Sequence, residues 1–285
     1  MKFLVTGGNG QLGMDIDSVF CQSNTVFALT KEQCDITNTS QIKDVMARIK
    51  PDCVINTAAM HHVEKCEADP FLAHAVNGIG TRSLAQECAR HDAHLIHIST
   101  DYVFNGEKRV PYVESDAPSP LNVYGNSKLS GEHYALSSWE KVSVVRVGGI
   151  YGVHPCRAKG GLNFVQLMLK LASERPHLRV VDDEIVTPTP TAAIAVQLQR
   201  IAEEGVYGLF HATCQGQCSW YAFAERIFAL RGITTDLQKA QPGEFPAKVA
   251  RPGYSVLENS RLKQLDIDCM PKWEDGLEEY LNTVG

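Results

Sequence analysis

The chain has 285 residues, a formal net charge of −6 and 44% hydrophobic residues. A negative balance argues against nucleic acid or an anionic membrane as the main partner, because both carry dense negative charge. No apolar run reaches the ~18 residues of a membrane span, and Met1 leads directly into a strand-like segment with no secretory signal before it. The nine cysteines are scattered without a C-x-x-C pair, so we expect reduced thiols in a cytoplasmic protein and predict no metal site.

The first segment, "KFLVTGGNGQLG", predicts a strand from Lys2 to Thr6, a glycine turn and then a helix. Glycines allow backbone angles that are closed to other residues and let a ligand approach the main chain. The helix N-terminus offers free N–H groups to a diphosphate. The spacing is G-x-x-G-x-x-G, and its position between strand and helix predicts a dinucleotide site.

A second strand is predicted from about Val26 to Leu29. In NAD-binding folds such a strand usually ends in a carboxylate that binds the ribose 2′-hydroxyl. Here it ends in Thr30-Lys31, which favours a 2′-phosphate and therefore NADPH over NADH; a solvated loop charge is the alternative for Lys31. Asp35-Ile36 follow, where a carboxylate and a backbone amide could meet the adenine.

The third strand lies in "DCVINTAAM" and ends in small residues, Thr57-Ala58-Ala59, past which a cofactor could lie close to the backbone. Asp69-Pro70 predicts the N-cap and first position of a long helix that continues to about His91 and contains Asn77.

A fourth strand, from about His94 to Ser99, is followed by Thr100, Asp101 and Tyr102. Ligands gather beyond the carboxyl ends of strands in a doubly wound parallel sheet, so these side chains are candidates for substrate contact. Tyr124 and Lys128 are four residues apart, which places them on one face of a helix. The ammonium would favour the phenolate and make the tyrosine a better proton donor.

The fifth strand is predicted from Val142 to Val147. Strands alternating with helices indicate an α/β fold of the Rossmann type, with a doubly wound parallel sheet. After Gly152 the alternation becomes irregular. We therefore predict a dinucleotide-binding domain over residues 1–150. Residues 151–285 are predicted to form mainly a smaller substrate-binding lobe, with segments that return to the first domain.

The motifs together resemble the extended short-chain dehydrogenase/reductase family, and within it the dTDP-4-dehydrorhamnose reductases. The resemblance spans nearly the whole chain. It rests on "GGNGQLG", "INTAAM", "HISTDYVFNG", "PYVESDAPSPLNVYGNSKLSGE", "VVRVGGIYG", "VVDDEIVTPT" and "RPGYSVLENSRLK".

The resemblance implies NAD(P)H-dependent reduction of the C4 ketone of dTDP-4-dehydro-L-rhamnose to dTDP-L-rhamnose. It implies that Tyr124 donates the proton, Thr100 hydrogen-bonds the developing oxyanion, and Lys128 holds the nicotinamide ribose and lowers the pKa of Tyr124. The cofactor-binding residues would be Gly7, Asn9, Gly10, Gln11, Leu12, Thr30, Lys31, Asp35, Ile36, Ala58, Ala59, Met60, Asn77, Tyr124 and Lys128. The substrate-binding residues would be Thr100, Asp101, Tyr102, Gly149, Asn163 and Phe164; a helix cap and a core aromatic are the alternatives for the last two.

Two departures from the family pattern concern the substrate. Gly149 stands where the family often has tryptophan, which would remove a stacking surface and enlarge the pocket. In "VVDDEIVTPT", Glu184 replaces an amide and Val186 replaces a glycine; a carboxylate near a diphosphate is unfavourable unless it faces solvent or a cation.

The sequence leaves three functional hypotheses open. One is the reductase named above, with a nucleotide-sugar substrate. Another is a reductase or epimerase of a different nucleotide sugar. The third is a non-catalytic regulatory subunit that kept the fold. The resemblance is also compatible with a homodimer.

Overall fold

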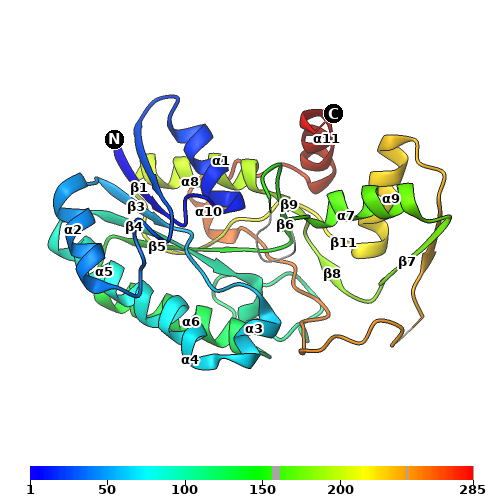
Figure 1. Ribbon diagram of the computed structural model, residues 1–285, viewed down its shortest axis with the longest axis horizontal. Coiled ribbons are helices and arrows are strands. Elements are labelled where there is room, and N and C mark those ends of the chain that lie inside the picture. Colours follow the sequence, from blue (N-terminus) through cyan, green and yellow to red (C-terminus); the bar gives the residue numbers. More distant parts are fainter. Residues whose placement is uncertain (156–160, 242, 285) are drawn as a thin grey trace.

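The computed structural model describes residues 1–155, 161–241 and 243–284. Its centre is a six-stranded parallel sheet in the order β10-β5-β4-β3-β1-β2 (Figure 1). The strands are β1 (Lys2–Thr6), β2 (Thr25–Leu29), β3 (Cys53–Asn56), β4 (His94–Thr100), β5 (Val142–Val147) and β10 (Gly208–His211). The predicted α/β fold with a parallel sheet is confirmed.

The strand order reverses between β1 and β3. From β1 the chain moves outward to β2 and then crosses back to β3 on the other side of β1. Loops on either side of such a switch point diverge, which leaves a crevice beyond the carboxyl ends of the strands where ligands bind. The glycine turn follows β1 directly and therefore lies at this point.

Helices cover both faces of the sheet (Figure 1). On one face α1 (Gln11–Phe20) packs against α8 (Thr191–Glu204); on the other, α5 (Thr81–Arg90) packs between α2 (Thr39–Ile49) and α6 (Val123–Ser138). Successive side chains of β1 enter different cores: Phe3 and Val5 join one cluster, Leu4 the other. Both faces are buried, so the strands are almost continuously apolar, as expected of a parallel sheet covered by helices.

The prediction of one long helix from Asp69 to about His91 is wrong in the middle of this range. It consists of α4 (Pro70–His74), a π-helical segment η1 (Ala75–Gly80) and α5, preceded by the short α3 (Val63–Ala68). Gly78 and Gly80 fall in η1, where glycine weakens the α-helix. Close contacts also require them: a Cβ at Gly80 would lie 3.0 Å from Ile36. π-Helical segments occur frequently at functional sites.

The second lobe lies to the right in Figure 1 and is built from short elements. It contains α7 (Phe164–Glu174), α9 (Trp220–Arg231), the parallel pair β7 (His177–Val180) and β12 (Asp236–Lys239), and the antiparallel pair β8 (Ile185–Val186) and β11 (Cys218–Ser219). β6 (Ile150–Tyr151) pairs with β9 (Thr189–Pro190) between these and the sheet.

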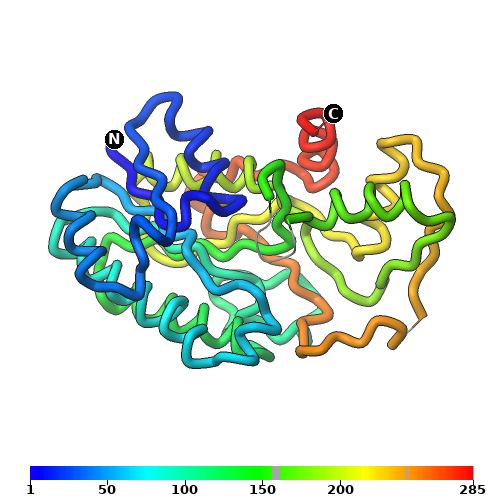
Figure 2. The backbone as a smooth tube through the Cα atoms, viewed as in Figure 1, coloured from blue at the N-terminus to red at the C-terminus, as the bar shows by residue number. Residues whose placement is uncertain are grey.

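Several segments after residue 150 belong spatially to the first domain. β10 extends the central sheet beside β5, and α8 covers it, while α10 (Ser260–Gln264) packs against β10 and α11 (Trp273–Thr283) against β9. Figure 2 shows the chain after α9 running along the outer edge of the lobe and returning to the centre. The division at residue 150 stays a prediction. No helix among the described residues has the length and apolar character needed to cross a membrane.

A buried ion pair fixes α6 to the sheet. Glu132 on α6 accepts hydrogen bonds at 2.9 and 2.7 Å from Arg146 on β5, and each side chain is only 2% exposed. Ser99 on β4 donates to the same carboxylate. Glu132 lies one turn beyond Lys128, so the Glu132–Arg146 pair determines where the face of α6 that carries Tyr124 and Lys128 meets the strand ends.

We expect Arg146→Leu to lower the free energy of unfolding by about 3–5 kcal/mol, because it leaves the Glu132 carboxylate buried without its cation. Urea denaturation measures the change. Lys170→Ala removes the exposed Lys170–Glu174 pair and serves as the control, with an expected change below about 0.5 kcal/mol. Equal changes in the two variants would contradict this account of how α6 is held.

Candidate functional site

The glycine turn after β1 is shaped for a closely approaching ligand. Gly7 has a φ of +71°, and a Cβ there would lie 2.9 Å from the backbone nitrogen of Ala58. A Cβ at Gly13 would lie 2.6 Å from the carbonyl of Gly7. Gly10 is the N-cap of α1 and has no side chain that could occupy the helix N-terminus. The backbone amides there fit a diphosphate.

The neighbours of this turn have different environments. Asn9 is partly exposed in the turn itself, whereas Leu12 is buried in the apolar core. The Gln11 side chain donates to the carbonyls of Gly152 and His154, at 3.2 and 2.8 Å. Gln11 therefore offers its backbone to the predicted cofactor, while its side chain joins α1 to the segment after β6.

The residues predicted for the adenosine end lie together after β2. The Lys31 ammonium is 3.7 Å from the carboxylate of Asp35, and the Lys31 side chain is 73% exposed. Partial burial opposes ionisation, but hydrogen bonds from Thr37 and the charge of Lys31 hold the pKa of Asp35 below its usual value. Thr30 lies beside them, and its amide donates to Gln33. Ile36 is buried against Gly80.

The segment after β3 lines the same edge of the sheet. Ala58, Ala59 and Met60 are partly exposed there. Asn77 in η1 holds this segment: its Oδ1 accepts from the amide of Met60, and its Nδ2 donates to the carbonyl of Met60, both at 2.9 Å. Nδ2 also donates to Ser127 on α6. Asn77 thus positions Met60, which lines the predicted cofactor path, and connects this segment to α6.

The structure brings Thr100, Asp101, Tyr102 and Tyr124 together at the end of β4. Asp101 to Val103 form a short 3-10 helix, η2 (Asp101–Val103), and Tyr124 lies in the first turn of α6. The Tyr124 hydroxyl is hydrogen-bonded to the Thr100 side chain, and the rings of Tyr102 and Tyr124 meet edge to face at 5.8 Å. A Cβ at Gly125 would lie 2.2 Å from the carbonyl of Tyr102, so glycine is required for α6 to pack this closely on η2.

Lys128 points toward β4 and is 3% exposed. Its Nζ donates to the carbonyl of Ile98 at 2.6 Å and lies 3.4 Å from Nε2 of His97. Burial lowers the pKa of Lys128 to about 8, against the opposing charge of Glu132. Sequence reasoning missed His97 and Ile98, because no spacing indicates which strand atoms a buried lysine will meet.

The expectation that Lys128 lowers the pKa of Tyr124 is wrong for this structure. Burial raises the pKa of Tyr124 above that of a free phenol; the hydrogen bond to Thr100 opposes this, and the charge of Asp101 adds to it. Helical spacing aligns the two residues on α6, but the ammonium is turned to the carbonyl of Ile98. Desolvation therefore outweighs the expected attraction.

Asp101 is a buried carboxyl group beside the hydroxyl pair. Burial raises its pKa to about 6, against hydrogen bonds from Ser255 and Thr100. A Cβ at Gly148 would lie 2.9 Å from its carboxyl carbon, so the glycine gives this carboxyl group room. Ser255 and Gly148 were not predicted; both lie in motifs that carried the family resemblance.

The expectation that Gly149 enlarges the pocket is also wrong. Gly149 has a φ of +58°, and a Cβ there would lie 2.4 Å from the carbonyl oxygen of Thr187. The backbone of Thr187 and Pro188 fills the space into which a side chain would extend. The glycine is required by this close approach of the β6–β9 pair.

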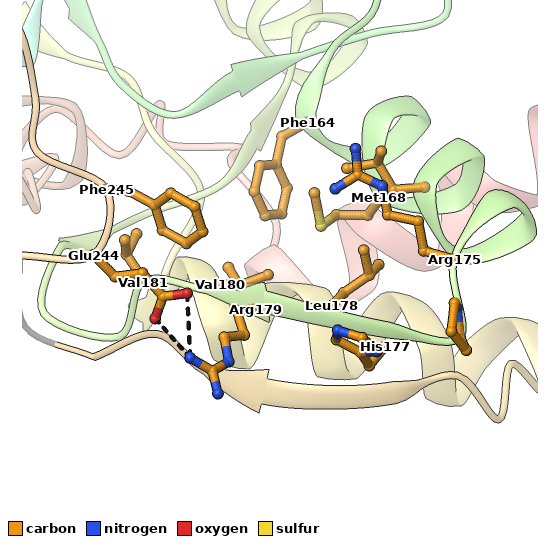
Figure 3. Close-up of a pocket in the computed structure, with 12 residues that line it drawn as sticks. Phe164, Met168, Arg175, His177, Leu178, Arg179, Val180, Val181, Glu244 and Phe245 are labelled. Carbon is orange, nitrogen blue, oxygen red and sulfur yellow. Dashed lines mark hydrogen bonds and ion pairs between the residues drawn. The ribbon is translucent and has the colours of Figure 1, made fainter.

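A cavity of about 530 Å³ lies in the second lobe between α7, β7 and the segment around Phe245 (Figure 3). Its walls are mainly apolar, and Arg175, His177 and the Arg179–Glu244 ion pair lie at its edge. Phe164 lines it. Asn163 caps α7 with a capping box and donates to the carbonyl of Gly152 and the hydroxyl of Tyr280, so its amide is used within the protein.

Glu184 faces a cation and an indole. Its carboxylate accepts from Trp220 Nε1 at 3.1 Å, and its charge helps raise the pKa of Arg251. Arg251 also pairs with Glu64 on α3 at 2.8 Å, which joins the second lobe to the first domain. The substituted carboxylate is therefore compensated. Val186, the other substituted position, is buried in β8. Within the described residues no cluster of potential metal ligands is present; Cys156 lies outside them.

Residues 1–285 match the family model described as "RmlD substrate binding domain". Among curated proteins, the chain is 37% identical to the spore coat polysaccharide biosynthesis protein SpsK of Bacillus subtilis, covering 98% of this chain and 96% of that protein. It is 34% identical to the dTDP-4-keto-6-deoxy-D-glucose reductase of Streptomyces niveus, covering 97% and 95%.

Two solved structures are also similar along their whole length. One is a dTDP-4-dehydrorhamnose reductase from Clostridium acetobutylicum, with a TM-score of 0.94, 38% identity, and coverage of 100% of this chain and 99% of that one. The other is a dTDP-4-dehydrorhamnose reductase from Bacillus anthracis in complex with NADP, with a TM-score of 0.94, 35% identity and 99% coverage of both chains.

We expect Gly149→Ala to destabilise the protein by about 2–4 kcal/mol, because the methyl group adds steric overlap to the cost of a positive φ. Gly232→Ala is the control: Gly232 has a φ of +62° with no atom within 4 Å of its Cβ position, so only the backbone term of about 1–2 kcal/mol applies. Chemical denaturation measures both. A Gly149→Ala variant as stable as Gly232→Ala would restore the open-pocket interpretation.

Proposed function

This chain belongs to the family of the RmlD substrate binding domain, and we propose that it is an NAD(P)H-dependent oxidoreductase that converts dTDP-4-dehydro-L-rhamnose into dTDP-L-rhamnose. The resemblance inferred from the motifs is confirmed by the family match. The observation that carries the proposal is the Thr100–Tyr124 hydroxyl pair at the end of β4, at the same sheet edge as the glycine turn. A ketone reduction needs a proton donor and an oxyanion partner at that position.

The chemistry divides between two hydroxyl groups of this chain. When bound, the nicotinamide cofactor supplies the hydride to C4 of the sugar. Tyr124 donates its phenolic proton to the C4 oxygen. The Thr100 hydroxyl, which donates to Asp101 at 3.0 Å in the structure, turns to donate its hydrogen bond to the same C4 oxygen. Because burial raises the pKa of Tyr124, the phenol stays protonated at neutral pH and is ready to act as the acid. Lys128 binds the nicotinamide ribose through an N–H that its bond to Ile98 leaves available.

The nucleotide part of the substrate fits the cavity between α7 and β7. Phe164, Met168, Leu178, Val180 and Phe245 provide apolar walls for a base, and Arg175 and His177 lie on the same lobe (Figure 3). The cavity does not include Tyr124. An extended nucleotide sugar would bridge the two parts, with the sugar reaching Asp101 and Tyr102 at the end of β4.

NADPH is the proposed cofactor. No carboxylate ends β2, and Lys31 is exposed beside the site expected for the adenosine ribose. Its partner Asp35 lies 3.7 Å away, at the long end of an ion pair, so a 2′-phosphate can compete for the ammonium. The similar enzyme from Bacillus anthracis was solved with NADP. We also propose that the protein acts in the cytoplasm and leave a homodimer as a hypothesis.

The relative from Streptomyces niveus points to a second candidate substrate, dTDP-4-keto-6-deoxy-D-glucose. A panel of nucleotide 4-keto-sugars distinguishes the two by the oxidation of NADPH and NADH, with product configuration determined by NMR. We expect the highest kcat/KM with dTDP-4-dehydro-L-rhamnose and NADPH. A preference for the second sugar would select that function, and no turnover with any keto-sugar would favour the non-catalytic subunit.

We expect Tyr124→Phe to lower kcat by about 10²–10⁴-fold, because it removes the general acid. The Kd of the cofactor should stay nearly constant, as measured by fluorescence titration. Tyr134→Phe, on the same helix but 37% exposed, is the control and should keep wild-type turnover. Wild-type kcat in Tyr124→Phe would show that the proton comes from another group.

A further inference from the structure

A row of buried polar side chains crosses the sheet just before its carboxyl edge. Thr6 on β1, Asn56 on β3 and His97 on β4 are neighbours in the strand register, and each is fully buried. Thr6 lies 2.7 Å from Asn56 Oδ1, and Asn56 Nδ2 lies 3.1 Å from His97 Nδ1. The row ends at Lys128, whose Nζ is 3.4 Å from His97 Nε2. It therefore connects the strand before the glycine turn to α6.

Apart from His97, the groups near Lys128 do not supply enough hydrogen-bond acceptors for its ammonium. Its ammonium has three N–H groups, and the carbonyl of Ile98 accepts one. Glu132 lies one turn further along α6, but its carboxylate oxygens accept from Ser99 and Arg146. A buried ammonium without acceptors loses its charge. His97 is the side chain placed to supply the second one.

The charge state of the lysine fixes the tautomer of the imidazole. Burial, followed by the charge of Lys128, lowers the pKa of His97 well below its usual value, so the ring is neutral. A neutral imidazole has one N–H and one lone pair, and an ammonium can only donate. With Lys128 charged, Nε2 must accept and the proton must be on Nδ1.

The Nδ1 proton requires an acceptor in turn, which orients Asn56. The amide of Asn56 must present Oδ1 to His97 and its NH₂ group to Thr6, a half-turn that keeps the same volume. In the structure Asn56 Nδ2 also donates to Thr81 Oγ1 at 3.4 Å, and that hydroxyl donates to the carbonyl of Asn77. The half-turn therefore also requires the Thr81 hydroxyl to turn its proton toward Asn56 Oδ1. The opposite orientation, with Nδ2 toward Nδ1, fits a neutral Lys128 that accepts from Nε2–H. The row thus has two hydrogen-bonding directions, one for each protonation state of Lys128.

We propose that His97 is a positioning residue for Lys128: its Nε2 accepts a hydrogen bond from the ammonium and, with the carbonyl of Ile98, holds that charge at the end of β4. This inference rests on the proposed role of Lys128 in cofactor binding. His97 itself is fully buried and acts through the lysine.

The tautomer of His97 tests the inference without turnover. The protein is labelled with ¹⁵N-histidine, and the ring is observed by long-range ¹H–¹⁵N correlation at a pH well below the pKa of about 8 of Lys128. Loss of its signals in His97→Gln assigns them. We expect a protonated Nδ1 and an unprotonated Nε2. A protonated Nε2 under these conditions would overturn the proposal.

Two variants separate the hydrogen bond from packing. The amide of His97→Gln reaches the place of Nε2 and can accept from Lys128, whereas that of His97→Asn reaches only the place of Nδ1. We expect His97→Asn to lower kcat/KM and weaken cofactor binding by about ten- to a hundredfold, the effect of losing a hydrogen bond to a charged group. His97→Gln should stay within about threefold of the wild type. Equal losses in both variants would mean that His97 only fills space.

The pH profile supplies a further readout. The titratable groups that face Lys128 and its neighbour Tyr124 are Glu132 on α6, His97 on β4, Asp101 and Tyr102 on η2, and Cys66 on α3. In His97→Asn the alkaline limb of the kcat/KM profile should move to lower pH by about one unit, because the ammonium loses an acceptor. His94→Asn is the packing control: His94 is also buried on β4 but bonds Ser143 on β5, and its variant should keep the limb in place. An unmoved alkaline limb in His97→Asn contradicts the proposal.

The reductase assignment and this inference can fail separately. If the wild type reduces no keto-sugar but shows the Nδ1–H tautomer, and His97→Asn binds the cofactor more weakly, the reductase assignment fails while this inference stands.

Discussion

The close packing of α6 against β4 and β5 is the constraint on which the site depends. The helix is anchored by the buried Glu132–Arg146 pair and meets its neighbours at two glycines. A Cβ at Gly125 would lie 2.2 Å from the carbonyl of Tyr102, and one at Gly131 would lie 2.3 Å from the carbonyl of Asn77. Contacts this tight fix both the position and the rotation of the helix. Tyr124 is therefore placed beside Thr100 by backbone packing before any ligand binds.

Burial has opposite effects on the two proposed functional groups of α6. It raises the pKa of Tyr124, which keeps the phenol protonated, and it lowers the pKa of Lys128 to about 8, which brings the ammonium close to losing its proton. A proton donor tolerates this environment, but a cation requires acceptors. The carbonyl of Ile98 and the His97 ring lie where those acceptors are needed. The polar row across the sheet thus compensates for an otherwise apolar interior around the lysine.

The parts of the fold governed by local patterns could be predicted from sequence. The glycine turn, the strands from β1 to β5 and the convergence of Thr100 with Tyr124 follow from apolar runs, turn residues and the common edge of a parallel sheet. The π-helical segment was missed because its contacts with Ile36 and α6 are distant in sequence. β10 lies after the regular alternation ends, and its place beside β5 depends on pairing with residues more than 60 positions away. The direction of Lys128 and the backbone contact at Gly149 depend on single atoms of other segments, which no periodicity encodes.

The cavity between α7 and β7 is separate from the Thr100–Tyr124 hydroxyl pair, and this separation affects how the enzyme could distinguish substrates. The cavity belongs to the second lobe, whereas Thr100 and Tyr124 belong to the sheet, and Arg251 and Glu64 join the two parts. Binding of the nucleotide far from the reacting carbon can orient the ketone, because remote contacts contribute to positioning at the reacting centre. At Gly149 the backbone of Thr187 occupies the direction that a side chain would take. In the proposed function the sugar is bound at the end of β4, where the Asp101 carboxyl group is buried between Gly148, Thr100 and Ser255. A carboxyl group with a pKa near 6 can accept or donate a hydrogen bond near neutral pH, so its protonation state can determine which hydroxyl arrangement of a sugar it matches.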